Sequence, residues 1–350
     1  MSTNSIPVGS AVLGRVLNAN GEPIDHKGNL ADAVHVPHYA LDAKSARAGT
    51  TSMRVLETGI KVLDLMAPAS YGSMIGMMAG SGLGLAVVAE EFMHTLITRH
   101  QAVLIVAGMS ETTYDATALR EMVRNIEAED RVVMLFEQNT DAISVRQRLL
   151  RTAMTIAAHF DGAGQEVVLV IDRHLVIPET MADVHLFAAA KGITSLLFVP
   201  MDELDQPADS RVLNELDVEW WFSRIRAKHS LWPAVDPLAS RSRVLSSNAV
   251  SQEHRQVAER VRDVLLRYYE LRERAGSEAL SEEDRRLLAR GERIDLFLTQ
   301  PFVVAEAYTD LPGAYLTIEE TINSFRDVLD GRYDAVPAPS FNFVGRIDQG

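Results

Sequence analysis

Cysteine is absent from this 350-residue chain, which excludes disulfide bonds and thiolate metal sites. Aromatic residues are scarce, at 6%, whereas hydrophobic residues make up 47% and charged residues 23% of the sequence. The last two fractions are ordinary for a soluble globular protein. The length is sufficient for two domains and a sizeable core.

Long apolar runs and positive charge are scarce too. No uninterrupted apolar stretch approaches the roughly 20 residues that cross a bilayer, and residues 1–8 lack the pattern of a signal peptide. We therefore expect a cytoplasmic protein without direct membrane insertion, either free or peripheral to a membrane complex. Lys and Arg number 34 against 48 Asp and Glu, which gives a net charge of −14. Nucleic-acid binding needs clustered positive charge, so no nucleic-acid partner is expected.

Six short apolar runs alternate with helix-like stretches in the middle of the chain. The runs are residues 74–78, 102–106, 132–136, 167–171, 193–199 and 218–222. Helical patterns occupy residues 86–98, 117–127 and 142–160. Fully apolar strands that alternate with helices indicate a mostly parallel sheet covered on both faces, which is an α/β fold.

Helical patterns replace strands after about residue 248. Residues 251–274, 281–299 and 317–330 read as amphipathic helices, and Ser281 with Asp284 forms a helix-capping pattern. The sequence therefore predicts three parts. They are an N-terminal extension or linker at residues 1–50, an α/β domain at 51–247 and a C-terminal helical domain at 248–350.

A glycine-rich turn follows the first apolar strand of the α/β domain. Gly80, Gly82 and Gly84 lie between that strand and the helix that follows, and Leu85 and Ala86 come next. A strand, a glycine-rich turn and a helix are the context of a phosphate-binding loop, whose backbone N–H groups surround phosphate oxygens. A working loop also needs a Lys for the terminal phosphates and a Ser or Thr hydroxyl for magnesium. Those two places hold Leu85 and Ala86, so the turn alone favours a tight connection without a ligand.

Four longer segments argue for more than a tight turn, because they resemble the beta subunit of the rotary (F-type) ATP synthase. They read VGSAVLGRVLN at residues 8–18, ETGIKVLDLM at 57–66, PAVDPLASRSR at 233–243 and FLTQPFVVAE at 297–306. The third segment is similar to the family's signature, and its Asp236 makes it closer to beta than to alpha. The resemblance extends over most of the chain.

The resemblance implies a RecA-like P-loop NTPase core with a degenerate Walker A turn, followed by a C-terminal helical domain. It describes a divergent paralogue that lacks the family's N-terminal β-barrel. Glu111 matches the family's catalytic Glu, and Thr112 stands where an Arg follows that Glu. Asp172 matches the acidic residue that orders magnesium through water, and Val176 replaces a phosphate-contacting Arg. Leu85, Thr112 and Val176 thus stand at three positions where the family has a Lys or an Arg.

The resemblance also points to an adenine end of the site. Trp232, Phe302 and Tyr308 match aromatic positions around the base, and flat rings suit a purine. The opposing interpretation is that these rings are ordinary core or helix-packing aromatics. If any cofactor is bound, the resemblance implies ATP or ADP with magnesium, held weakly and through the base.

The missing cations decide between the functions that the resemblance implies. Charge-assisted contacts to phosphate are worth roughly 1.5–3 kcal/mol each. We therefore favour a non-catalytic beta-like subunit, a pseudo-ATPase with a structural, regulatory or assembly role. The alternative is a divergent ATPase or ATP synthase beta subunit that hydrolyses or makes ATP with an alpha-like subunit. A nucleic-acid translocase with the same core is disfavoured by the acidic balance.

Partners follow from the same resemblance. An alpha-like ATPase subunit is expected, or further copies of this chain, in a ring or a smaller oligomer. Residues 278–284, from Glu278 to Asp284, are similar to the acidic segment through which the beta subunit acts on the central stalk. A central-stalk-like protein is therefore a further expected partner.

Overall fold

The computed structural model describes residues 5–30, 32–39, 53–109, 121, 124, 128–137, 142–202, 204–207, 209–274 and 280–347. The chain forms two compact units, each treated by itself below. The first consists of Met1–Ser52, Ser70–Gly80 and Phe92–Glu219, and the second of Met53–Ala69, Ser81–Glu91 and Trp220–Gly350. Both units draw on distant parts of the sequence, so the three-part domain organisation at residues 1–50, 51–247 and 248–350 stays a prediction.

An eight-stranded sheet contributes most of its strands to the first unit. Its order is β12-β11-β6-β10-β9-β7-β8-β2. The strands are β2 (Val16–Leu17), β6 (Met74–Met78), β7 (Val103–Met109), β8 (Val132–Glu137), β9 (Val167–Ile171), β10 (Thr194–Val199), β11 (Val218–Trp221) and β12 (Arg241–Ser242). The pairings from β6 through β10, β9, β7 and β8 to β2 are all parallel. The mostly parallel sheet predicted from the apolar runs is therefore confirmed.

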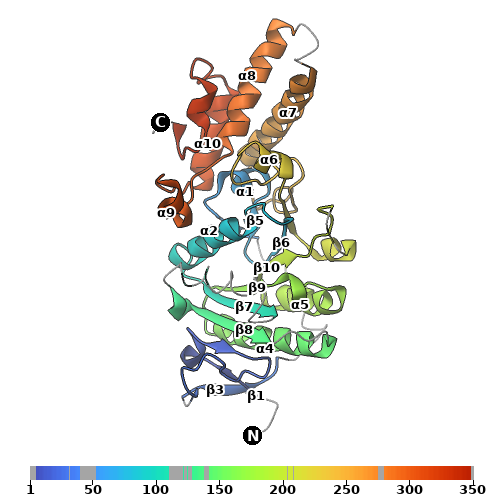
Figure 1. Cartoon of the computed structure of the whole chain (residues 1–350), viewed down its shortest axis with the longest axis vertical. Helices are drawn as coiled ribbons and strands as arrows, with labels where there is room; N and C mark the ends of the chain where they lie inside the picture. Colours follow the sequence, from blue (N-terminus) through green and yellow to red (C-terminus); the bar gives the residue numbers. More distant parts are fainter. Residues whose placement is uncertain are drawn as a thin grey trace. The chain divides into compact units, whose positions relative to one another are not determined.

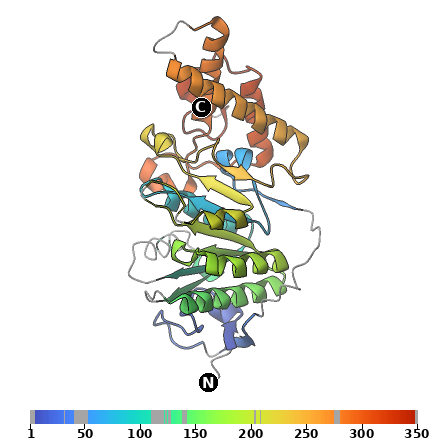
Figure 2. The same cartoon turned by 90° about the vertical axis from the view of Figure 1, so that its right-hand side faces the viewer.

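Burial explains why the central strands of this sheet are mostly apolar. Every residue of β6, β9 and β10 is buried, as expected where helices cover a parallel sheet. In the first unit, α4 (Ile143–Gly162) and α5 (Pro178–Lys191) pack side by side over one face of the sheet (Figure 2). An antiparallel ribbon of β1 (Ser5–Val8) and β3 (Val34–Pro37) contacts α4 (Figure 1).

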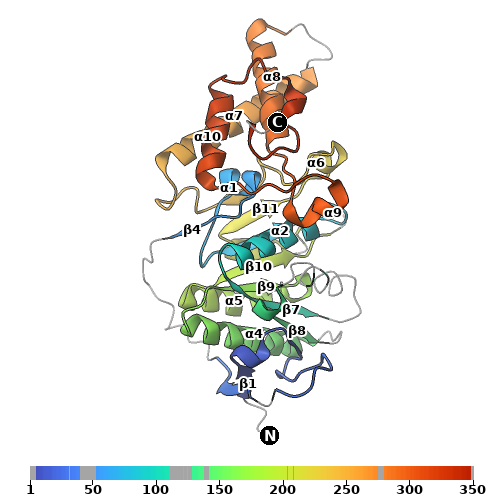
Figure 3. The same cartoon turned by 90° about the vertical axis from the view of Figure 1, so that its left-hand side faces the viewer.

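Helices dominate the second unit. α7 (Gln252–Arg274), α8 (Glu282–Phe297) and α10 (Ile318–Leu329) pack against one another, and α1 (Lys61–Met66) contacts α10 (Figure 3). Among the shorter elements are β4 (Val55–Leu56), β5 (Ala69–Ser70), α6 (Arg224–Lys228), η6 (Val303–Ala305), α9 (Glu306–Thr309) and η7 (Ala338–Phe341). The RecA-like α/β core with C-terminal helices is the fold that the sequence predicts.

Two aromatic contacts and one cap account for much of this helical packing. The Phe297 ring lies 4.8 Å from the Phe325 ring and 6.1 Å from the Phe341 ring, measured between centroids. The Ser281 hydroxyl accepts the Asp284 N–H at 3.0 Å, which confirms the predicted cap at the start of α8. No helix in the described part of the chain is long and apolar enough to cross a membrane.

Candidate functional site

The glycine turn connects β6 to α2 (Leu85–Thr98). Gly82 has φ +80° and Gly84 has φ +77°, in the left-handed region that side-chain-bearing residues rarely adopt. Gly80 precedes them without a positive φ. Gly82 and Gly84 therefore give this turn a backbone conformation that favours glycine.

The first turn of α2 presents apolar side chains next to this glycine turn. Leu85 is half-buried, Ala86 is exposed, and Val87 is 41% exposed. Free N–H groups and the helix dipole make such a helix start suitable for an anion. Leu85 supplies no charge to neutralise a phosphate, and Ala86 has no hydroxyl that could bind magnesium. The degenerate phosphate loop that the resemblance implies at this turn remains a prediction.

One cation does touch the turn, and the sequence analysis did not single it out. Arg224, on the first residue of α6, donates from Nη1 to the Ser81 carbonyl at 3.4 Å. The bond is long, and it engages a backbone oxygen of the turn. The only sequence signal for Arg224 was its position shortly after the apolar run at residues 218–222.

Trp232 lies directly on the glycine turn. A Cβ built on Gly84 would sit 3.0 Å from Cζ3 and 3.4 Å from Cε3 of the indole. The Trp232 carbonyl accepts the Gln300 N–H at 3.0 Å, which fixes the backbone of this residue. Trp232 as a whole is half-buried.

The two other aromatic residues of the predicted adenine end have unlike environments. Phe302 is buried, with 6% of its surface exposed, whereas Tyr308 on α9 is 85% exposed. No ring pair within the described ranges joins Trp232, Phe302 and Tyr308. Their role as an adenine site stays a prediction, and Trp232 is the ring with a contact to the turn.

A buried carboxylate ties α2 to the segment that carries Phe302. Glu91 is 4% exposed, and its Oε2 accepts the Val304 N–H at 3.1 Å. Burial raises the pKa of Glu91, while the N–H groups of Val304 and Val303 act in the opposite direction. Figure 3 shows α9, which follows this segment, beside α2. Glu91 was not predicted, because a single Glu inside a helical pattern carries no signal.

Asp172 and Val176 belong to the first unit. Asp172 directly follows β9, is 1% exposed, and donates its N–H to the Ala107 carbonyl at 2.9 Å. Val176 is also 1% exposed, so its side chain belongs to the core and offers no contact to a phosphate. The proposed magnesium role of Asp172 remains a prediction.

Metal binding finds little support in the residues present. Within the described ranges, no three His, Asp or Glu side chains converge as they would around a metal ion. The hydroxyl that a phosphate loop contributes to magnesium is missing at Ala86. The donor set at the glycine turn therefore does not fit a magnesium ion, and no step of chemistry is assigned to one. Glu111, Thr112 and Glu278 lie outside the described residues.

Comparison with known families locates one match. Residues 59–189 match the model of the ATP synthase alpha/beta family, nucleotide-binding domain. The matched range is less than half of the chain. It includes the glycine turn and Asp172, and it ends before Trp232. The match supports a nucleotide-binding fold of the ATPase type for this range.

Proposed function

We propose that this protein is a non-catalytic ATP synthase beta-like subunit, a pseudo-ATPase that binds nucleotide weakly at most. One observation carries the proposal. The glycine turn keeps its two positive-φ glycines, Gly82 and Gly84, but α2 begins with Leu85 and Ala86. The loop geometry of a phosphate site is therefore retained without the charge and the hydroxyl that make it bind and react.

The magnitude of the lost contacts supports weak binding. A charge-assisted hydrogen bond contributes roughly 1.5–3 kcal/mol, and every 1.4 kcal/mol is about tenfold in affinity. Loss of the loop Lys alone would weaken phosphate binding by about ten- to a hundredfold on this scale. The uncharged residues Thr112 and Val176 at two further Arg positions extend the deficit, and Val176 is buried in the core.

The base end of a nucleotide has better support than the phosphate end. Trp232 rests on Gly84 and is half-buried as a whole. A purine stacked on an indole face gains contact without any need for positive charge. We infer that any residual affinity for nucleotide comes from the base, with Phe302 and Tyr308 as further candidates.

A structural, regulatory or assembly role follows from a retained fold without a working site. We propose that the chain associates with an alpha-like subunit or with copies of itself, in a ring or a smaller oligomer. Residues 278–284 are the proposed contact for a central-stalk-like protein. The proposed cytoplasmic location, free or peripheral to a membrane complex, rests on the lack of a signal-peptide pattern and of a long apolar run in the sequence. The acidic charge balance is the basis for proposing no nucleic-acid partner.

A turnover assay with radiolabelled ATP tests the proposal. The purified chain is assayed with magnesium, alone and with an alpha-like subunit. We expect no release of phosphate above the background of a heat-denatured sample. Turnover that disappears in a Glu111→Gln variant would show that the chain is an enzyme.

Arg224 favours one alternative, a divergent ATPase or ATP synthase beta subunit. Its guanidinium donates a hydrogen bond to the Ser81 carbonyl, so one positively charged side chain contacts the glycine turn. In this alternative, ATP turnover with the alpha-like subunit would be lost in an Arg224→Met variant. The matched control is Arg211→Met, at an exposed ion pair with Asp209.

A further inference from the structure

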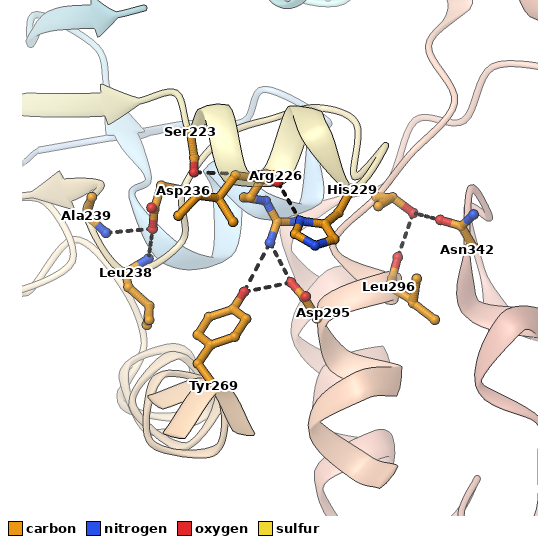
Figure 4. Close-up of polar contacts among 12 residues, drawn as sticks. Ser223, Arg226, His229, Asp236, Leu238, Ala239, Tyr269, Asp295, Leu296 and Asn342 are labelled. Carbon is orange, nitrogen blue, oxygen red and sulfur yellow. Dashed lines mark hydrogen bonds and ion pairs between the residues drawn. The ribbon is translucent and has the colours of Figure 1, made fainter. Parts of the chain in front are cut away.

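Three polar side chains of the second unit, two of them buried and the third half-buried, meet where α6, α7 and α8 come together (Figure 4). Nη1 of Arg226 donates to Oδ1 of Asp295 at 2.5 Å and to the Tyr269 hydroxyl at 3.4 Å. The Tyr269 hydroxyl donates to the same Asp295 oxygen at 2.9 Å. The side chains of Arg226 and Asp295 are each 4% exposed. We call these three residues the α6–α8 cluster.

α7 and α8 pack closely beside the α6–α8 cluster. A Cβ on Gly291 would lie 2.4 Å from Cβ of Tyr268, so only glycine permits this approach. Burial and the nearby Asp295 carboxylate raise the pKa of Tyr269, which stays a neutral hydrogen-bond donor. Nε and Nη2 of Arg226 are buried without a partner among the described residues. Burying the Arg226–Asp295 ion pair costs desolvation free energy, and removing one of the two charges is strongly destabilising.

Trp232 is connected to the α6–α8 cluster through the backbone on two sides. The Arg226 carbonyl accepts the N–H of Leu231, the residue before Trp232, at 3.0 Å. The Trp232 carbonyl accepts the Gln300 N–H at 3.0 Å, three residues past the end of α8. One connection therefore leads to Arg226 on α6 and the other to the segment after α8, and the indole between them lies on Gly84.

We infer that Arg226 is a positioning residue, which holds the Trp232 indole on the glycine turn through its ion pair with Asp295. Helices α6, α7 and α8 thereby fix the position of the Trp232 ring relative to the glycine turn. A contribution of this ring to base binding rests on the function proposed above, whereas the positioning of the ring does not. In a purely structural role, by contrast, the same contacts would stabilise the packing of α6, α7 and α8 without fixing the position of the Trp232 ring.

Fluorine NMR of the full chain labelled with 5-fluorotryptophan separates the two roles. The sequence holds three tryptophans, so three resonances are expected. A Trp232→Phe variant assigns the resonance of Trp232. Trp220, fully buried with Nε1 bonded to the Ala67 carbonyl at 2.9 Å, is the internal control for the fold.

The informative variant removes both charges together. In Arg226→Met/Asp295→Met, apolar side chains replace the ion pair, which leaves no unpaired buried charge and preserves folding. We expect the Trp232 resonance to shift by more than its line width, while the Trp220 resonance stays in place. Tyr269→Phe, which retains the ion pair, is expected to cause a smaller shift of the same resonance.

A second ion pair of the same unit provides the matched control. Arg260 and Asp330 are 2.7 Å apart with side chains 47% and 45% exposed, and Arg260→Met/Asp330→Met should move neither resonance. An unmoved Trp232 resonance in the Arg226/Asp295 variant would overturn the inference. Equal shifts of Trp220 and Trp232 would also overturn it, because they indicate a general loosening.

Adenosine added to the labelled native chain tests the link to base binding separately. A shift of the Trp232 resonance on titration would support a base stacked on this ring. No shift would count against base binding in the proposed function and leave the variant result to decide the positioning role.

Discussion

Leu85 and Ala86 deprive the first turn of α2 of one positive charge and one hydroxyl, while the backbone around them stays suited to an anion. The side chains lie at an exposed to half-buried surface, so replacing them creates no cavity and buries no charge. Chemistry at these two positions can therefore be changed without loss of the fold.

Restoring the missing groups should restore affinity for a triphosphate. We expect Leu85→Lys/Ala86→Thr to bind Mg-ATP about ten- to a hundredfold more tightly than the native chain, because one charge-assisted contact is worth roughly 1.5–3 kcal/mol. Isothermal titration calorimetry measures the change. Val87→Lys, which adds a charge on the same turn of the helix at another position, is the control. An equal gain in both variants would contradict a specific site.

The two positive-φ glycines allow a matched test of Trp232. Both positions are strained for alanine, but a Cβ on Gly82 meets open space, whereas one on Gly84 meets the Trp232 ring at 3.0 Å. We expect Gly82→Ala to lower the free energy of unfolding by about 1 kcal/mol and Gly84→Ala by more.

Acrylamide quenching of tryptophan fluorescence measures whether the Trp232 ring is displaced. Quenching should rise in Gly84→Ala, because the added methyl group displaces the indole, and stay at the native level in Gly82→Ala. Identical quenching in the two variants would contradict the observed contact.

From the sequence, the glycines between the first apolar strand and the next helix indicated a tight connection or a phosphate-binding loop. The structure adds the positive φ of Gly82 and Gly84, which the sequence analysis did not predict. Burial of individual side chains was not predictable, since Phe302 is in the core and Tyr308 is exposed. Arg226 and Asp295 are 69 residues apart, so no local sequence pattern predicts their ion pair.

At the scale of elements, the start of α1 depends on one buried carboxylate. Asp64 accepts N–H groups from Thr58 at 2.9 Å and Gly59 at 2.8 Å, and also the Thr58 hydroxyl at 2.9 Å. Burial raises the pKa of Asp64 from 3.8 to about 7, despite these hydrogen bonds. The folded chain therefore holds the Asp64 proton more tightly than the unfolded chain does.

This pKa shift predicts how stability changes with pH. The contribution of Asp64 is fully present below pH 4 and is lost as the pH rises from about 4 to about 7, because the unfolded state releases the proton first. We expect Asp64→Asn to remove this part of the decline. Urea denaturation at a series of pH values measures the free energy of unfolding.

Asp310→Asn is the control for the Asp64 variant. Asp310 is exposed and adopts a left-handed conformation that Asn tolerates, so its pH profile should match the native one. A profile unchanged in Asp64→Asn would contradict the raised pKa.

The boundaries of two central strands could be predicted from their apolar runs. β6 and β9 occupy residues 74–78 and 167–171 as predicted. β7 extends past the predicted residue 106 to Met109 and so includes Gly108, where a Cβ would lie 2.8 Å from the Phe136 ring. The parallel pairing of β2 with β8 was not predictable, because it joins residues more than 100 positions apart. The predicted helix at residues 117–127 lies almost entirely outside the described residues.

At the scale of the whole molecule, the chain has an ATPase-type fold, and we propose that its phosphate site is incomplete. The family match over residues 59–189 supports the fold, and the side chains at Leu85 and Ala86 argue against ordinary use of ATP. A net charge of −14 adds a general repulsion toward an anionic ligand. The central claim is therefore that the intact chain does not bind a triphosphate tightly.

Calorimetric titration of the native chain with ATP, with and without magnesium, tests this claim most directly. The account predicts weak binding that magnesium does not strengthen, with adenosine bound at least as well as ATP. Tight, magnesium-dependent binding of ATP, with γ-phosphate density against the turn from Gly80 to Gly84 in an experimental map, would contradict it.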